Sequence, residues 1–189
     1  MTGITPLFPR QKTPDLTLAT TAGTTWRLAD QDPEHFTMIV FYRGLHCPIC
    51  RAYLQDLNAK HAEFASRGVE ILVASSDTKE RAEEAAKTWS IGNLRLAYGL
   101  SLDKAREWGL YISRGRGKTS IGIEEPALFS EPALYLVKPD GTLYFGAVQT
   151  MPFARPVFAD ILKAIDFVIA KDYPGRGEVI DHHRLAAAE

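Results

Sequence analysis

The segment 36–42 reads Phe-Thr-Met-Ile-Val-Phe-Tyr, a continuous run rich in β-branched and aromatic residues. Such a run predicts a strand buried on both faces, near the centre of a sheet. Gly44 breaks the run, and apolar residues then recur at helical spacing over 48–65. The chain is therefore predicted to pass from a buried strand directly into a helix.

The same alternation continues along the chain. Further strands are predicted at 69–75 and 94–98, and further helices at 78–89, 101–109 and 156–171. Asp77 or Thr78 is the expected cap of the helix at 78–89, with Glu80 in support. Hairpins are predicted at 14–28, around Gly23, and at 133–148, across the Lys-Pro-Asp-Gly turn of 138–141. Residues 113–132 form an excursion with few apolar residues in its first half. Strands alternating with helices imply parallel pairing, and the late hairpin adds an antiparallel edge.

Length and charge limit the class of protein. The chain has 189 residues, of which 46% are hydrophobic, which fits one globular domain. We expect a single domain over 1–171, followed by a tail over 172–189. The net charge of −1 argues against a partner such as nucleic acid or an anionic membrane surface. No apolar run is long enough to cross a bilayer, and the first residues show no secretion signal. A cytoplasmic protein is expected.

The chain has only two cysteines, and both lie in Cys47-Pro48-Ile49-Cys50. A disulfide between them would close a very short loop, so it would add little stability as a structural crosslink. Cys47 is predicted at the start of a helix, where free backbone N–H groups and the helix dipole favour the thiolate. Pro48 suits the first helical position. Cys50 lies one turn further, where it could attack a mixed disulfide formed at Cys47.

Neighbouring residues bear on this chemistry and leave alternatives open. His46 would lower the pKa of Cys47 if it were protonated, and Arg43 adds positive charge. Cys50 could instead be a plain buried residue. The pair could also be half of a zinc site, with His46 and His61 as further ligands, although the spacing fits no standard finger. A redox pair is favoured over both alternatives.

The segment from Phe41 to Cys50 resembles the alkyl hydroperoxide reductase and thiol-specific antioxidant family, a peroxiredoxin-like branch of the thioredoxin superfamily. The resemblance covers roughly 13–170 and includes three further stretches. They are the opening hairpin with Pro14-Asp15-Leu16, the segment from Ser101 to Leu110, and the late strand and turn from Ala133 to Gly141. The order and spacing of these motifs are more specific than any one of them. The resemblance implies a thioredoxin-like fold, with a central mixed sheet flanked by helices and an N-terminal β-hairpin extension.

The resemblance assigns Cys47 to the peroxide-attacking cysteine of the family. Two positions depart from the family pattern. Gly44 stands where the peroxidases have Thr or Ser, and Pro132 stands where they have Arg before the late strand. A proline there, together with Cys-x-x-Cys, is similar to the thioredoxin site, in which this proline is cis and faces the cysteines. We therefore expect a cis bond before Pro132, with the 131–133 backbone open to an extended substrate.

The sequence thus predicts an oxidoreductase without a cofactor or a bound metal. The first hypothesis is a thiol–disulfide oxidoreductase, with Cys47 as nucleophile and Cys50 as resolving thiol. The first alternative is a thiol-dependent peroxidase that uses the same two cysteines. The second is a non-enzymatic metal- or partner-binding module. Expected partners are a disulfide or peroxide substrate and a thiol reductant such as a thioredoxin or glutathione system; the relatives are often homodimers.

Overall fold

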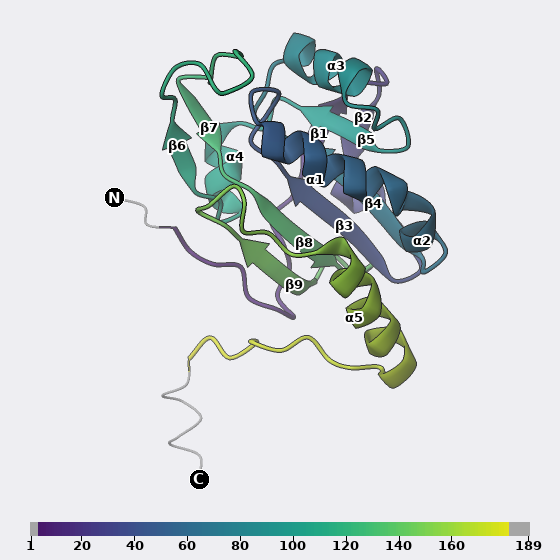
Figure 1. Ribbon diagram of the computed structural model, residues 1–189. Helices are drawn as coiled ribbons and strands as arrows, with labels where there is room; N and C mark the ends of the chain where they lie inside the picture. Colours follow the sequence, from purple (N-terminus) through teal and green to yellow (C-terminus); the bar gives the residue numbers. More distant parts are fainter. Residues whose placement is uncertain (1–3, 182–189) are drawn as a thin grey trace.

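A computed structural model describes residues 4–181 (Figure 1). The strands are β1 (Thr17–Thr20), β2 (Thr25–Arg27), β3 (Phe36–Phe41), β4 (Val69–Ala74), β5 (Arg95–Tyr98), β6 (Ile112–Arg114), β7 (Leu128–Ser130), β8 (Ala133–Val137) and β9 (Leu143–Val148). The helices are α1 (Pro48–Ala59), α2 (His61–Ala65), α3 (Lys79–Thr88), α4 (Leu102–Glu107) and α5 (Phe158–Lys171). A short 3-10 turn, Leu28–Asp30, follows β2.

Seven of the strands form one mixed sheet in the order β2-β1-β5-β4-β3-β8-β9. The central pairs β3–β4 and β4–β5 are parallel, whereas the hairpin strands at both edges pair antiparallel. The expected α/β fold, with a mixed sheet and an N-terminal hairpin, is confirmed. β3 has neighbours on both sides, β4 and β8, which explains why its sequence is a continuous apolar run.

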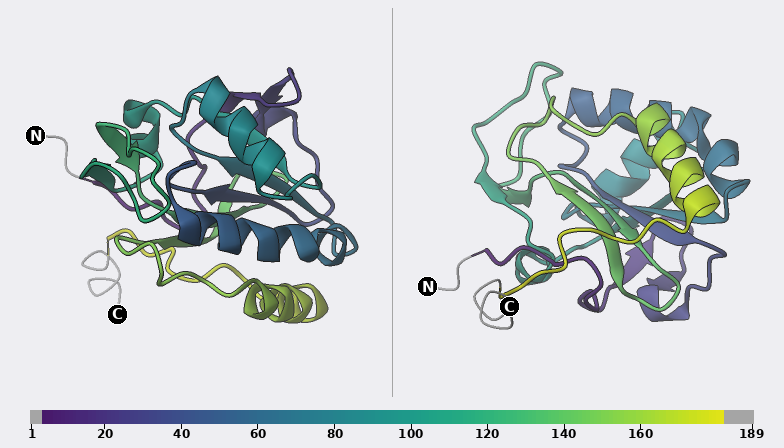
Figure 2. Two further views of the ribbon diagram at one scale, coloured as in Figure 1. Left: turned by 45° about the horizontal axis from the view of Figure 1, so that its top comes forward. Right: turned by 90° about the horizontal axis from the view of Figure 1, so that it is seen from below.

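The side chains of β3 alternate between two hydrophobic cores, one on each face of the sheet. Met38 and Val40 belong to the core under α1, α3 and α5, which also contains both cysteines. Ile39 and Phe41 belong to the opposite core, which contains α4 and the N-terminal hairpin. This alternation follows from the two-residue period of a strand. The helix that carries the cysteines is thereby packed against the sheet, and α5 lies beside it (Figure 2).

Three parts of the predicted element order need correction. The helix expected over 48–65 is divided at Lys60, whose backbone leaves the helical region at φ −97° and ψ 3°. The two-stranded ribbon β6–β7 begins at Ile112, just before the excursion over 113–132, and was not predicted because the first half of the excursion is poor in apolar residues. The last helix begins at Phe158 rather than 156. These are local changes, and the order of the main elements is as expected.

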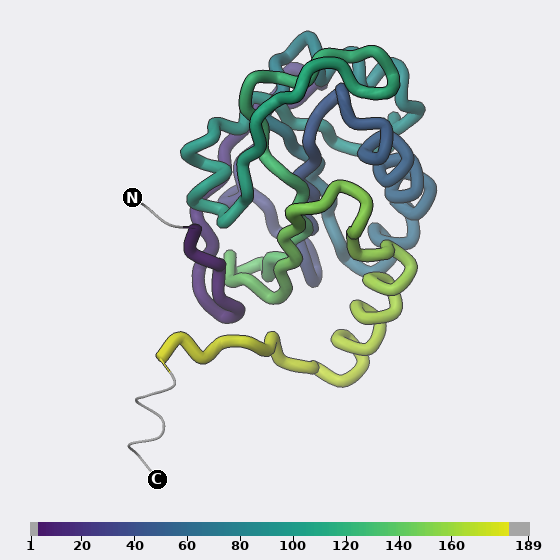
Figure 3. The backbone as a smooth tube through the Cα atoms, turned by 60° about the vertical axis from the view of Figure 1, so that its left-hand side comes forward, coloured from purple at the N-terminus to yellow at the C-terminus, as the bar shows by residue number. Residues whose placement is uncertain are grey.

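Three segments converge near the start of α1. They are the turn after β3, the excursion between β6 and β7, and the loop between β9 and α5 (Figure 3). The predicted tail over 172–189 follows the C-terminal end of α5, whereas the loop from β9 enters the N-terminal end of that helix (Figure 1). Its part beyond 181 lies outside the described residues. Within 4–181, no helix is long and apolar enough to span a membrane.

Candidate active site

The two cysteines occupy the first turn of α1, as predicted. Cys47 is the N-cap residue, with extended backbone angles of φ −100° and ψ 102°, and Pro48 is the first helical residue. The Cys47 Sγ accepts a hydrogen bond from the backbone N–H of Cys50 at 3.2 Å. The sulfur therefore satisfies one of the free N–H groups at the helix start, a position that favours its thiolate.

The two thiols have opposite pKa shifts. The pKa of Cys47 is lowered to about 6 by hydrogen bonds from the side chain and backbone of Cys50 and by the charges of Arg155 and Arg43, which outweigh the effect of burial. The pKa of Cys50 is raised by burial and by the neighbouring Cys47. Cys47 is therefore the more acidic of the two thiols, as its place at the start of the helix predicts. A thiol at the start of a helix is also expected to be more exposed than one inside the first turn. That expectation is wrong here, because the exposed fractions are 1% for Cys47 and 0% for Cys50.

Arg155 completes the surroundings of the sulfurs, and sequence reasoning missed it. Its Nη2 lies 3.0 Å from the Cys50 Sγ and 3.9 Å from the Cys47 Sγ. Its Nε donates to the Pro152 carbonyl at 2.5 Å, and its guanidinium lies 5.0 Å from the centre of the Tyr53 ring. Its Nη1 is buried and has no hydrogen-bond partner among the described residues. The only sequence signal is a single charge within the otherwise apolar stretch 151–158.

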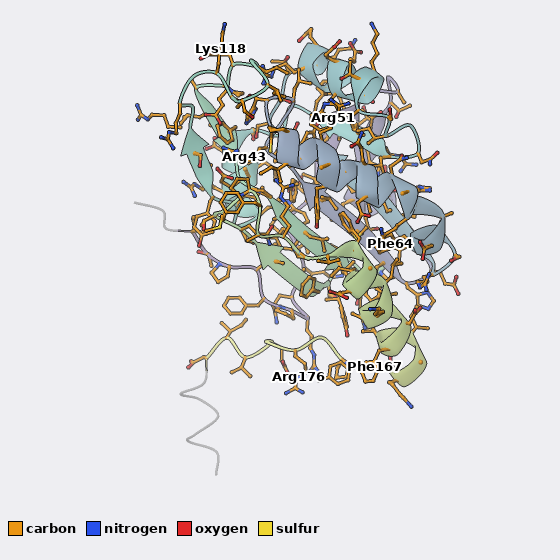
Figure 4. The ribbon with its side chains drawn as sticks, in the orientation of Figure 1. Arg43, Arg51, Phe64, Lys118, Phe167 and Arg176 are labelled. Atoms are coloured by element: carbon orange, nitrogen blue, oxygen red, sulfur yellow. The ribbon has the colours of Figure 1, made fainter. Side chains whose placement is uncertain are left out.

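Arg43 lies beside the start of α1, where it ties the excursion to the site (Figure 4). Its Nη2 lies 3.3 Å from Glu125 Oε1, and its Nε lies 3.3 Å from Glu131 Oε2. The guanidinium also lies 4.7 Å from the centre of the Phe129 ring. Arg43 thus serves both as an anchor of the excursion and as a positive charge that lowers the pKa of Cys47.

His46 is buried and does not supply a positive charge near neutral pH. Its pKa is lowered to about 4 by burial and by the charges of Arg43 and Arg81. Its ring packs on Phe129, with centroids 4.7 Å apart, and its Nδ1 lies 3.4 Å from Arg81 Nη2. The condition under which His46 would lower the pKa of Cys47, a protonated ring, is therefore not met near neutral pH, because Phe129 and two arginines surround the ring in the folded chain.

The prediction of a cis bond at Pro132 is also wrong. The Glu131–Pro132 bond is trans. The Pro132 carbonyl accepts from the Gln149 N–H at 2.9 Å, and the Glu131 N–H donates to the Tyr111 carbonyl at 2.7 Å. These bonds extend the β8–β9 pairing and hold the excursion. Two of the polar backbone groups expected to bind an extended substrate, the Glu131 N–H and the Pro132 carbonyl, are therefore already paired within the chain.

Gly44 stands where the family pattern has a hydroxyl residue, and the Asp77 carboxylate lies beside it. Gly44 has φ +133°, and a Cβ there would lie 2.7 Å from both carboxylate oxygens of Asp77. That carboxylate accepts from the Leu45 N–H at 2.7 Å and from Arg81 Nε at 2.9 Å. Asp77 therefore orders the turn before Cys47 and does not cap α3, whose N-cap residue is Thr78.

The residues considered as zinc ligands do not come together. His46 precedes α1, whereas His61 begins α2 beyond the other end of α1. In the described part of the chain, no three His, Cys, Asp or Glu side chains are grouped so that they could hold a metal ion.

Comparison with known proteins identifies the family. The family model described as AhpC/TSA matches residues 9–145. The chain belongs to the AhpC/TSA family. The matched segment contains both cysteines and Pro132, but ends before Arg155. Membership confirms the resemblance found in the sequence, and with it the expectation of a thiol oxidoreductase of the peroxiredoxin-like class.

Solved structures of this family share the fold at low sequence identity. Peroxidoxin BcpB from Mycobacterium tuberculosis is 18% identical, with a TM-score of 0.66 over 86% of this chain and 98% of that one. AhpC from Enterococcus faecalis is 19% identical, with a TM-score of 0.68 over 89% of this chain and 98% of that one. Thioredoxin peroxidase I from Plasmodium yoelii is 20% identical, with a TM-score of 0.66 over 93% of this chain and 97% of that one. No curated protein sequence matches the chain.

Proposed function

We propose that this protein is a thiol-dependent hydroperoxide reductase, in which Cys47 reacts with peroxide and Cys50 resolves the product. The Cys47 thiolate attacks one peroxide oxygen and the O–O bond breaks. Cys47 becomes a sulfenic acid, and the departing alkoxide or hydroxide takes a proton. Cys50 then attacks the Cys47 sulfur, so that a disulfide forms and water leaves.

One observation carries this proposal: the sulfur of Cys47 is acidic yet almost closed to solvent. Its pKa is lowered to about 6, so it is mostly thiolate at neutral pH. Its exposed fraction is only 1%, which admits a small oxidant more readily than a protein disulfide. The Arg155 guanidinium lies 3.9 Å from the Cys47 Sγ and supplies a positive charge to it, which Pro132 cannot do.

The neighbouring Cys50 favours an intramolecular disulfide as the oxidised product. Both cysteines lie in the first turn of α1, and Arg155 contacts both sulfurs. A thiol reductant of the thioredoxin or glutathione type would return the pair to its reduced form. The name of the Plasmodium yoelii relative, thioredoxin peroxidase I, supports a thioredoxin-type reductant. We propose the cytoplasm, which maintains such reductants, as the compartment.

A thiol–disulfide oxidoreductase is the second candidate, and exposed apolar side chains near the site favour it. Ile49 lies between the two cysteines and is 38% exposed. Phe153 is 68% exposed on the loop that carries Arg155, and Met151 and Val157 are exposed on the same loop. These side chains offer an apolar contact to a protein substrate. To use it, the loop over 151–157 would have to move away from the sulfurs.

Stopped-flow mixing of the reduced protein with hydrogen peroxide, and separately with a protein disulfide such as insulin, distinguishes the candidates. We expect peroxide to oxidise both thiols much faster than insulin does. In Cys50→Ser, peroxide should leave a Cys47 sulfenic acid that dimedone traps, detected as an adduct by mass spectrometry. Cys47→Ser should form no adduct. Rapid reaction with insulin and slow reaction with peroxide would instead establish the second candidate.

A further inference from the structure

The Arg155 guanidinium lies closer to the resolving sulfur than to the attacking one. Its Nη2 is 3.0 Å from the Cys50 Sγ, against 3.9 Å from the Cys47 Sγ. Cys47 also has the Cys50 N–H and the charge of Arg43 to stabilise its thiolate. For Cys50, Arg155 is the only cation in contact with the sulfur among the described residues.

Cys50 needs such help because it must lose a proton inside the protein. Its side chain is completely buried, and burial disfavours the thiolate. Within 4–181, no carboxylate or imidazole is hydrogen-bonded to either sulfur, so no conventional base is in place. The charged groups that act on Cys50 are Cys47 itself and Arg155.

We propose that Arg155 is the catalytic residue of the resolving step, where it holds the Cys50 sulfur as a thiolate once Cys47 has reacted. This role rests on the dithiol cycle proposed above. In the reduced protein, Cys47 carries the negative charge, and a second thiolate beside it is repelled. Oxidation or mixed-disulfide formation removes that charge from Cys47. The guanidinium then has Cys50 as its nearest anionic partner, and a charge-assisted hydrogen bond can form.

The resolving step then balances within the site. The Cys50 thiolate attacks the Cys47 Sγ, the S–S bond forms, and the S–O bond of the sulfenic acid breaks. The electron pair leaves with hydroxide, which takes up the proton given by Cys50 and departs as water. Arg155 Nη1, which is buried without a partner among the described residues, is available to donate to that oxygen.

The side chain of Arg155 is held in place by its own loop and by α1. Its Nε donates to Pro152, and its planar group lies 5.0 Å from the centre of the Tyr53 ring. The Tyr53 hydroxyl in turn donates to the Pro156 carbonyl at 2.8 Å, which ties the adjoining residue to the helix. Lysine at 155 would keep the charge but would lose this planar, multiply bonded arrangement.

Ellman's reagent tests this role without relying on peroxide. The Cys47 thiolate first forms a mixed disulfide and releases one thionitrobenzoate; Cys50 then displaces a second one as the protein disulfide forms. Stopped-flow absorbance therefore gives two rates, one for each cysteine. In Arg155→Met, we expect the second release to slow about tenfold or more, since a rise of about one pKa unit lowers the thiolate fraction about tenfold. The first release should slow less.

Two further variants and a pH profile complete the test. Arg155→Lys should restore part of the rate of the second release. If Arg155→Met fails to fold, the two release rates of Arg155→Lys are measured in its place. Lys163→Met, which removes an exposed cation of α5, should change neither rate. The pH midpoint of the second release should move upward in Arg155→Met. Equal slowing of both releases, or an unchanged second release, would overturn the proposal. If peroxide fails to oxidise the wild-type protein, the proposed peroxidase fails, and this test of Arg155 still stands.

Discussion

Cys47 and Cys50 are neighbours in one helical turn, but the protein gives their sulfurs different surroundings. The Cys47 Sγ accepts the free N–H of Cys50 at the helix start and lies within the influence of two guanidinium groups. Cys50 is enclosed by the core and has one cation in contact, Arg155. These surroundings support the proposed roles, with Cys47 as the anionic nucleophile and Cys50 as a protonated thiol that is activated afterwards.

The pH dependence of alkylation follows from these surroundings. Because the pKa of Cys47 is lowered to about 6, its thiolate fraction falls only when the pH drops through that value. We expect the rate of iodoacetamide labelling at Cys47 to rise with a midpoint near pH 6, followed by mass spectrometry of the reduced protein. Cys47→Ser should show only slow labelling at Cys50. A midpoint near the ordinary cysteine value of about 8.5 would contradict the proposed activation.

His46 makes the folding stability depend on pH. Its pKa is lowered to about 4 in the folded protein by burial and by Arg43 and Arg81, against about 6.5 in the unfolded chain. Between these values the unfolded state binds the proton and the folded state does not, so the free energy of unfolding decreases as the pH falls. We expect a loss of up to about 3 kcal/mol between pH 6.5 and 4 relative to His46→Leu, since one pKa unit corresponds to about 1.4 kcal/mol.

Urea denaturation of both proteins across this pH range measures the effect. If His46→Leu packs poorly, it is less stable than the wild type near neutral pH. The difference in the free energy of unfolding between the two proteins should shrink as the pH falls. A difference that stays constant from pH 6.5 to 4 would show that His46 has an ordinary pKa in the folded state.

At the scale of elements, the turn between β3 and α1 sets the position of Cys47. Gly44 has φ +133°, a region that L-residues rarely adopt, and its missing Cβ leaves room for the Asp77 carboxylate. We expect Gly44→Thr to lower stability by about 2 kcal/mol or more and to slow peroxide reduction, although it introduces the hydroxyl residue of the family pattern. Gly23→Ala is the matched control, because Gly23 has φ +77° and a Cβ added there would meet no atom within 4 Å.

Thermal unfolding and peroxide kinetics of the two variants separate backbone strain from the clash with Asp77. Gly23→Ala should be destabilised only by the cost of a positive φ in alanine, and it should reduce peroxide at the wild-type rate. If Gly44→Thr is as stable as the wild type or reduces peroxide faster, then the Asp77 carboxylate does not restrict the side chain at position 44.

The sequence predicted those elements whose residues repeat regularly. β3 and α1 were evident from the apolar run and the helical spacing, and the two cysteines followed because they lie where these elements meet. The ribbon β6–β7 was missed, since its pairing depends on contacts between residues 112–114 and 128–130 rather than on local pattern. Arg155 was missed for a similar reason: it reaches the sulfurs from a loop far along the chain, 105 residues beyond Cys50. His46 was recognised, but its neutral state depends on Phe129 and Arg81, which only the fold brings beside it.

At the scale of the whole molecule, the division into a domain over 1–171 and a tail over 172–189 stays a prediction. The described part of the tail runs past β9 and the N-terminal segment, away from the start of α1 (Figure 1). Arg10 Nε donates to the Gly175 carbonyl at 2.9 Å, and the Tyr144 hydroxyl donates to the Tyr173 carbonyl at 2.9 Å. These contacts add to the fold without touching the sulfurs.

A chain ended at Asp172 tests this division. It keeps the left-handed residue that closes α5, but it removes both of these hydrogen bonds and the bond from the Tyr173 N–H to the Val168 carbonyl. Each such bond contributes about 1 kcal/mol, so the loss should be about 3 kcal/mol. For a chain of this length, that corresponds to a fall of about 6–12 °C in Tm. The rate of peroxide reduction should remain that of the full chain, since Arg155 and both cysteines keep all their described contacts. Calorimetry and stopped-flow kinetics of the shortened protein measure both quantities. A shortened chain that fails to fold would make the tail part of the domain, and a folded one with a slower rate would connect the tail to the site.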